Sequence, residues 1–360
     1  MVLVFLHNLW GWFVLARALF GFDAFFFLYG QTITNSRLEL WLLKRAYKRI
    51  VFIYVGSDSR PPFIDGGRFP LSDGAPDIAL VNVLARQCKR RIRLHEKFAD
   101  YLVNAPATAQ FHERKFINWF AMGIPNDSVQ SDGQPLSSDC VRILHSPSNP
   151  AVKGSQEIHT IIDRLQKKGY PIKFVKVEGM PYEVVLRELS VCDFVVDQLY
   201  SDSPLAAFAS EAAFAGKPAV VGGYFAKAVA SYLQPQDMPP SLFVLPADIE
   251  AAIERLVIDR AFRLELGAKA RRFVTTHWTA KAVAERYLKL LNDDIPENWW
   301  FDPMDVRYVR GCGMPQAHAS RLVRELIARY GVRSLQVADK PELEQAFVRL
   351  AATPEHREDA

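Results

Sequence analysis

A single carboxylate, Glu211, lies in an otherwise apolar stretch of small residues, which reads FASEAAFAGKPAVVGG over positions 208–223. The Gly216-Lys217 pair in this stretch suggests a phosphate-binding loop. However, Pro218 follows the lysine, and Glu211 stands where that loop needs a glycine five positions before Gly216. The sequence also has no GxGxxG after a strand and no GxSxG, which excludes the usual dinucleotide and hydrolase motifs. The role of Glu211 must therefore come from the residues that neighbouring segments bring to it.

Cysteine spacing and charge exclude other classes of site. Cys88, Cys140, Cys192 and Cys312 lie far apart, without a CxxC pair or a histidine at metal-ligand spacing, which predicts a reducing compartment and no structural zinc. Charged residues make up 23% of the 360 residues and the formal net charge is +4, so we expect a folded protein without a nucleic-acid partner. The range 1–135 holds sixteen Lys and Arg against eleven Asp and Glu, an excess that would suit an anionic acceptor or a membrane surface.

The elements that must position Glu211 alternate between strand and helix patterns. The run IVFIYVG at 50–56 is typical of a buried parallel strand and ends in Gly-Ser-Asp. The polar stretch 128–140 is typical of a linker, and the alternation begins again after it. Such alternation builds a parallel sheet covered by helices on both faces. The sequence therefore predicts an α/β fold with two Rossmann-like, doubly wound domains that face a cleft.

The predicted bounds are 1–135 for the first domain, 136–292 for the second, and 293–360 for a crossing segment with a helical extension. Two amphipathic helices are predicted in that extension, at 317–330 and 340–351. In open parallel sheets a ligand binds at the carboxyl ends of the strands, so the cleft is the expected site.

The first 30 residues are the most apolar part of the chain. They lack a basic start and a small-residue cleavage site, which argues against a signal peptide. Arg17 and Asp23 interrupt the run that a membrane span would need. We predict a buried helix at 9–20 and a buried strand, AFFFLY, at 24–29, with an interfacial membrane helix as the alternative. The first domain is short, so its start is either compact or incomplete.

The segments around Glu211 occur in an order that resembles the donor-binding domain of GT-B glycosyltransferases, in particular the family 4-like group. These segments are HSPSNPAVKG, KFVKVEGMPYEVV, VCDFVVDQL, the stretch with Glu211, and RLELGAKARRFVTTHW. The resemblance covers residues 141–290. In the first half it rests on FDAFFFLYGQT and IVFIYVGSDSRPP. It also implies that the chain crosses back to the first domain near its end, where the Trp299-Trp300 pair would pin the crossing.

The resemblance implies a site for a nucleotide diphosphate sugar. A helix amino terminus lined by small residues can approach the two phosphates, and Glu211 would accept both ribose hydroxyls. Lys153 would stabilise the charge on the leaving diphosphate. The implied donor-binding residues are His145, Ser146, Lys153, Glu178, Gly179, Met180, Asp197, Ser203, Leu205, Ala206, Ala207 and Glu211. The implied catalytic residues are Lys153, Glu211 and Asp202.

On the acceptor side, two loops at predicted strand ends are candidates. They comprise Tyr29, Gly30, Gln31 and Thr32, and then Gly56, Ser57, Asp58 and Arg60. Structural alternatives stay open for several positions. Glu211 could face solvent, Lys153 could simply end a loop, Asp197 could cap a helix, Gly56 to Asp58 could form a turn, and His145 could be a buried structural histidine.

One departure from the family affects the chemistry. Many family members have a second glutamate eight residues before the one that Glu211 matches, whereas this sequence has Ser203 there, next to Asp202. The stereochemical outcome therefore stays open. Because no DxD-like pair is placed for Mg²⁺, we expect a metal-independent reaction without a cofactor.

The resemblance implies a glycosyltransferase that acts on a glycan or lipid-linked acceptor, in cell-surface polysaccharide biosynthesis. Its expected location is cytoplasmic, with peripheral association at the inner face of the membrane as an alternative. Two other functions are open: a binding module of the same fold that has lost turnover, and a nucleotide-sugar epimerase.

Overall fold

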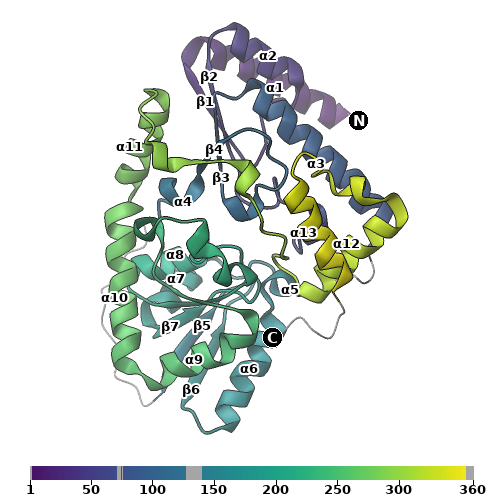
Figure 1. The fold of residues 1–360 in the computed structure, drawn as a ribbon. Coiled ribbons are helices and arrows are strands. Elements are labelled where there is room, and N and C mark those ends of the chain that lie inside the picture. Colours follow the sequence, from purple (N-terminus) through teal and green to yellow (C-terminus); the bar gives the residue numbers. More distant parts are fainter. Residues whose placement is uncertain (1, 71–73, 75, 127–139, 354–360) are drawn as a thin grey trace.

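The computed structural model describes residues 2–70, 74, 76–126 and 140–353, with the backbone alone for residues 2–8. The predicted linker, 128–140, lies outside the described residues except for its last position. The described chain forms two five-stranded sheets, one in each half of the molecule (Figure 1). The predicted α/β class is confirmed.

The first sheet has four parallel strands in chain order and a fifth, antiparallel strand from the C-terminal part of the chain. They are β1 Ala24–Leu28, β2 Arg49–Ile53, β3 Tyr101–Asn104, β4 Phe116–Asn118 and β10 Trp300–Phe301. Along β2, Ile50 and Phe52 are buried on one face of the sheet, while Val51 and Ile53 are buried on the other. Burial on both faces explains why this strand is apolar at almost every position.

Helices cover both faces of this sheet. The Phe52 face carries α1 Val2–Gly21, α2 Arg37–Arg45 and α3 Ile78–Phe98. In the same core, α12 Gln316–Tyr330 packs on α3, and α13 Pro341–Ala352 packs on α12. The Val51 face carries α4 Trp119–Met122 and α11 Ala280–Leu291.

The two helices that the sequence predicts near the C-terminus are confirmed, and they lie beside α3 as part of the core of the first domain (Figure 1). The Trp299-Trp300 pair packs on the other face of the first sheet, where Trp300 pairs with Ile117 of β4. β10, α12 and α13 therefore join the first domain, while the exact domain bounds stay a prediction.

The second sheet is fully parallel, in the order β6-β5-β7-β8-β9. Its strands are β5 Val141–His145, β6 Ile172–Lys176, β7 Phe194–Val196, β8 Ala219–Gly222 and β9 Leu242–Val244. Its helices are α5 Pro150–Lys153, α6 Ser155–Lys167, α7 Tyr182–Val191, α8 Ala207–Phe214, α9 Ile249–Ile258 and α10 Arg260–His277. This is a doubly wound order, because the chain moves from β5 to one side and then to the other. Such a switch leaves a crevice at the carboxyl ends of β5 and β7.

Short 3₁₀ helices connect these elements. They are η1 Pro62–Ile64, η3 Pro106–Thr108, η4 Tyr224–Lys227, η5 Val229–Ser231, η6 Pro235–Asp237, η7 Pro246–Asp248, η8 Glu297–Trp299, η9 Pro303–Asp305 and η10 Val332–Leu335.

A short segment before α12 joins the two domains through backbone hydrogen bonds. The Cys312 N–H donates to the Ile64 carbonyl at 3.0 Å, and the Gly66 N–H donates to the Cys312 carbonyl at 2.8 Å. The Gly313 N–H donates to the Tyr200 carbonyl of the second domain at 2.8 Å. Residues 312–313 therefore contact both domains at once.

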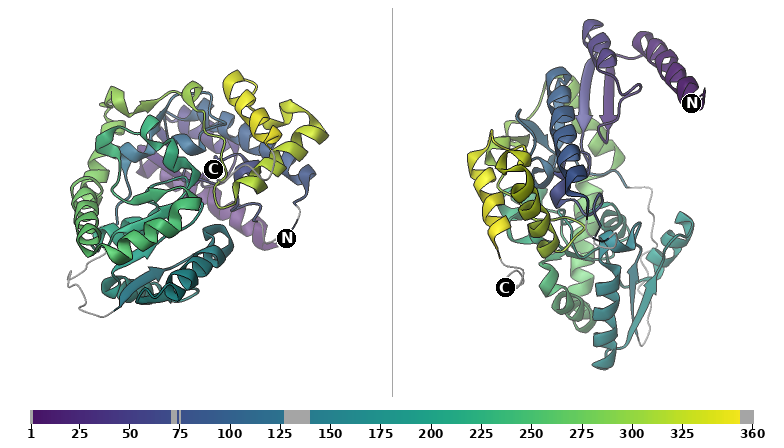
Figure 2. Two further views of the ribbon diagram at one scale, coloured as in Figure 1. Left: turned by 60° about the horizontal axis from the view of Figure 1, so that its bottom comes forward. Right: turned by 90° about the vertical axis from the view of Figure 1, so that its right-hand side faces the viewer.

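The N-terminal helix is not buried as predicted. Leu15 and Ala18 pack on the core, but Trp10, Phe13 and Phe20 are exposed, the last at 94%. Figure 2 shows α1 at the outer edge of the first domain, away from the second. The prediction was wrong because an apolar run does not reveal which element covers it. Among the described residues, no helix is long and apolar enough to cross a membrane.

Candidate functional site

The two domains face each other across a cleft of about 420 Å³. The first domain lines it with residues that follow or end β1, β2 and β3 and with residues of α4, and the second domain lines it with the loop before α8. Four predicted site residues from the second domain lie here, together with one from the first: Asp202, Ser203, Ala206, Ala207 and Gly56. The cleft therefore joins parts of the predicted donor and acceptor sides.

Helix α8 begins at this cleft with free backbone donors. Its N-cap residue is Ala206, and within the described residues no side chain caps its first turn. The first N–H groups of a helix lack intrahelical partners and carry partial positive charge. The first turn of α8 can thus bind an anionic group such as a phosphate.

Glu211 lies one turn farther along α8 and is partly buried. Burial raises the pKa of its carboxyl, while a hydrogen bond from the Tyr182 hydroxyl lowers it. Burial and the nearby charge of Glu211 raise the pKa of Tyr182 to about 12. Tyr182 thus stays a hydrogen-bond donor, and it holds a carboxylate that has further acceptor capacity for ligand hydroxyls.

The loop before Tyr182 is exposed. Glu178, Gly179 and Met180 follow β6 and lead into α7, and Gly179 adopts a left-handed backbone with φ +63°. The sequence did not single out Tyr182. Its position directly after the predicted donor loop, as an aromatic residue at the start of a helix, was the available signal.

Lys153 forms an ion pair with Asp197, with Nζ 3.1 Å from Oδ1. Asp197 is fully buried, and among the described residues its other oxygen has no hydrogen-bond partner. Gly154, next to Lys153, lets the chain approach Leu199, since it has φ +68° and a Cβ there would lie 2.6 Å from the Leu199 side chain. The structure thus shows Asp197 as the ion-pair partner of Lys153. One ion-pair contact leaves two ammonium hydrogens of Lys153 for a ligand.

His145 is buried inside the second domain. Its Nδ1 lies 2.8 Å from the Val196 carbonyl and its Nε2 lies 2.7 Å from the Ser155 hydroxyl, so both ring nitrogens are engaged. Burial lowers its pKa. This placement matches the alternative in which His145 is a buried structural histidine. Leu205 is also fully buried, whereas Ser146 is partly exposed.

Asp202 is engaged in an ion pair that crosses between the domains. Its carboxylate accepts from Arg60 Nε at 3.2 Å and from Arg60 Nη2, and Arg60 also donates to Asp65 at 3.1 Å. Burial opposes the charge on Arg60, but Asp202 and other acidic neighbours raise its pKa well above the usual value. In this arrangement Asp202 lines the cleft and connects the domains through Arg60, while its catalytic role stays a prediction.

The turn that begins at Gly56 is stabilised by hydrogen bonds between its own residues and to Asp65. Asp58 is buried and accepts from the N–H groups of Val55 and Gly56, at 3.0 and 2.9 Å, and burial raises the pKa of Asp58. The Ser57 hydroxyl donates to Asp65 at 3.1 Å. These contacts match the turn alternative, in which Gly56 alone of this trio lines the described cleft.

The loop after β1, residues 29–32, does not line the described cleft. Leu28, the last residue of β1, lines it instead. Tyr29 and Gly30 both adopt left-handed backbones, with φ 59° and 61°. Gln31 is exposed, and the Thr32 hydroxyl donates to the buried Glu39 at 2.7 Å. The predicted acceptor role of this loop therefore has no support from its position.

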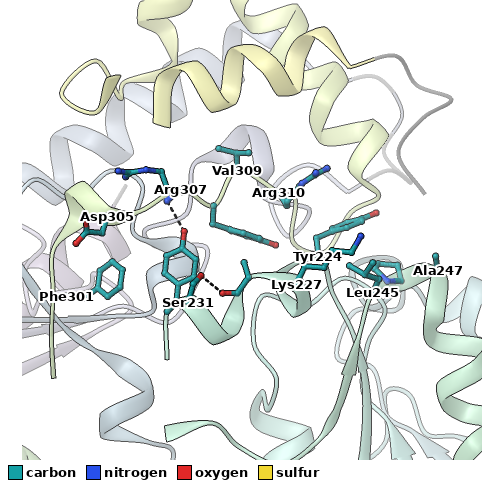
Figure 3. A pocket seen from close by; sticks show the side chains of 14 residues that line it. Tyr224, Lys227, Ser231, Leu245, Ala247, Phe301, Asp305, Arg307, Val309 and Arg310 are labelled. Atoms are coloured by element: carbon teal, nitrogen blue, oxygen red, sulfur yellow. Dashed lines mark hydrogen bonds between the residues drawn. The ribbon is translucent and has the colours of Figure 1, made fainter. Parts of the chain in front are cut away.

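A larger pocket, of about 730 Å³, lies outside this cleft between the 301–310 segment and the loops after β8 and β9. Figure 3 shows Phe301 and Asp305 at one end of it, with Tyr224 and Lys227 at the other. Its lining includes no predicted site residue. We therefore take the smaller cleft, where the free α8 terminus lies, as the candidate site.

No protein-family model matches the sequence, and no curated protein matches it. Among solved structures, Anabaena HepE in complex with UDP is 13% identical, over 79% of this chain and 82% of that chain, with a TM-score of 0.50. The catalytic domain of starch synthase IV from Arabidopsis thaliana, bound to ADP and acarbose, is also 13% identical over 80% and 76%, with a TM-score of 0.49.

At such low identity the likeness to HepE shows the fold alone. The fold is GT-B, with two Rossmann-like domains that face a cleft and a C-terminal helical extension. The predicted fold class is confirmed. Membership of the family 4-like group stays a prediction.

Proposed function

We propose that this protein is a glycosyltransferase that moves a sugar from a nucleotide diphosphate sugar to a glycan or lipid-linked acceptor. The observation that carries the proposal is the group of three features at the carboxyl edge of the second sheet. These are the uncapped start of α8, the Glu211 carboxylate held by Tyr182, and Lys153 held by Asp197. Together they suit phosphates and a vicinal diol. UDP in the HepE structure of the same fold supports a nucleoside diphosphate.

In the proposed reaction an acceptor hydroxyl oxygen bonds to the anomeric carbon of the sugar, and the hydroxyl proton is released to the solvent. The bond from that carbon to the diphosphate breaks, and the diphosphate leaves with the electron pair. Lys153 and the α8 amides would stabilise this negative charge, which is typically the largest catalytic contribution. We propose that no metal takes part.

We further propose a cytoplasmic enzyme of the family 4-like group that acts in cell-surface polysaccharide biosynthesis. Basic and apolar side chains exposed on α1 and α2, including Trp10, Arg17 and Trp41, would suit peripheral association with an anionic membrane. Vesicle co-sedimentation with and without anionic lipid tests this association.

The function is tested with UDP-, GDP- and ADP-sugars, with calorimetry for binding and chromatography for released nucleotide and changed sugar. Release of nucleotide that increases with added acceptors supports a transferase. Binding without turnover for every acceptor would instead identify a binding module, and a changed sugar without transfer would identify an epimerase. If no nucleotide sugar binds, the proposed function is wrong.

Glu211→Ala is expected to weaken UDP binding about 10- to 100-fold, because a hydrogen bond to a charged group is worth about 1.5–3 kcal/mol. Stability should change little, since the side chain is only partly buried. Calorimetry gives the affinity and thermal unfolding gives the stability. Glu265→Ala is the matched control, because Glu265 is exposed on α10 and pairs with Lys269. Equal affinity in both variants would rule out the ribose role.

Tyr182→Phe is expected to make UDP binding fail at a higher pH than in the wild type. The Tyr182 hydrogen bond lowers the pKa of Glu211, so its loss leaves the effect of burial and moves that pKa upward. Binding needs the ionised carboxylate and is therefore lost as pH falls through this pKa.

The measurement is UDP affinity between about pH 4.5 and 8. The titration of UDP itself is common to all proteins compared. Tyr170→Phe is the control, since Tyr170 bonds to Glu254 elsewhere. Identical pH profiles for the wild type and Tyr182→Phe would show that this hydrogen bond does not act on binding.

A further inference from the structure

The first-domain wall of the cleft is apolar. It includes Leu28, Ile53, Val55, Trp119, Phe120 and Ile124. Leu28 and Val55 are 57% and 50% exposed, so large aliphatic side chains face open space beside the start of α8. Exposed apolar side chains that gather in a concave site indicate a ligand with an apolar part.

Two polar side chains on this wall are already occupied. The Tyr54 hydroxyl lies 3.0 Å from His95 Nδ1, and the Thr108 hydroxyl donates to Asn104 at 2.7 Å. On the opposite side, Asp202 is paired with Arg60. A glycan in this position would find these three side chains already engaged and would have fewer partners for its hydroxyls.

The expected changes in affinity favour a hydrocarbon chain over a sugar on this wall. Each buried hydroxyl without a partner lowers affinity about 5- to 150-fold. Each methylene that leaves water on such a surface raises affinity about fourfold. A chain of several methylenes is therefore favoured over a sugar of similar length.

The apolar surface continues out of the cleft along β1. Tyr287 of α11 lines the cleft, and its ring packs edge-on against Phe26 with 5.5 Å between ring centroids. Phe26 is 40% exposed. A chain that starts at α8 can thus pass Leu28 and Tyr287 and reach the outside at Phe26.

We propose that the acceptor carries an apolar chain which lies on this wall, with its reacting hydroxyl at the Ser203 and Ala206 end. The acceptor is then a lipid-linked molecule rather than a free glycan. This inference rests on the proposed glycosyltransferase function.

The test uses n-decyl β-D-glucoside with a bromine at the end of its chain, below its micelle concentration, on the full-length protein. Bromine quenches tryptophan fluorescence on contact, and Trp119 lies in the wall. We expect saturable quenching in the wild type and a smaller quenched fraction in Trp119→Phe. Methyl β-D-glucoside at equal concentration should not compete.

Leu28→Asp supplies an independent site variant, because an exposed side chain tolerates a polar replacement. It should weaken decyl glucoside binding about tenfold or more. Leu264→Asp on α10, where the leucine is 47% exposed, should bind like the wild type.

Quenching that is unchanged in Trp119→Phe would place the chain elsewhere, for example at the exposed Trp10 or Trp41, and would overturn the inference. Competition by methyl glucoside would overturn it in favour of a glycan. UDP binding is measured on the same samples. If UDP binds and the chain does not, only this inference fails; if UDP does not bind, the proposed function fails.

Discussion

Lys153→Met is expected to lower the turnover of sugar transfer by about 100- to 1,000-fold, the usual cost of removing one group that stabilises transition-state charge. The variant also leaves Asp197 buried without its ion-pair partner, which we expect to lower the free energy of unfolding by up to about 3 kcal/mol. Steady-state kinetics with a nucleotide sugar and urea unfolding measure the two effects separately.

A double variant separates charge stabilisation from folding. Lys153→Met with Asp197→Asn removes both charges, so stability should recover while turnover stays low. Lys173→Met, at an exposed position on β6, is the control lysine. Recovery of turnover in the double variant would show that Lys153 acts only by neutralising Asp197.

Gly66→Ala is expected to disrupt the contact between the domains. A Cβ at Gly66 would lie 1.9 Å from the Gly313 carbonyl oxygen and 2.3 Å from its carbon. Backbone atoms cannot yield as a flexible side chain does, so the 312–313 segment must shift. Overpacking of this kind costs about 1–3 kcal/mol, and occasionally more.

Thermal unfolding and protease susceptibility of the domain junction measure this change. We expect a lower melting temperature and faster cleavage, because the hydrogen bonds of Gly66 and Gly313 hold both domains. Gly21→Ala is the matched control, since nothing lies within 4 Å of a Cβ at Gly21. If both variants melt at the same temperature, residues 312–313 do not restrain the domains.

The fold was predictable because its central strands and helices leave apolar patterns within short segments of the sequence. β2 is apolar along most of its length because both its faces are buried, and the helices of the second domain repeat apolar residues on one face. β10 was not predictable. It has two residues, and its pairing with β4 joins positions about 180 apart, which leaves no pattern in either segment.

The candidate site was predictable in outline only. Strand alternation gives His145 the same face as Ile143, which is buried in the core, and this alternation was the available sign that His145 points inward. The ion pair of Asp202 was not predictable for a different reason. Its partner, Arg60, comes from the other domain, so no local pattern shows that the carboxylate is occupied. The contact between Tyr182 and Glu211 likewise joins two helices that are separate in sequence.

The return of the chain to the first sheet has a consequence for synthesis on the ribosome. Residues 141–278 form the second sheet and its helices without a break. The first domain lacks β10 and the core residues of α12 and α13 until about residue 352 has been made. Domains generally fold as units from the N-terminus during translation. Here the domain that is synthesised second is the first that can be completed. The earlier domain must wait until about residue 352 has been made, with Phe63, whose ring packs edge-on against Phe347 of α13, uncovered.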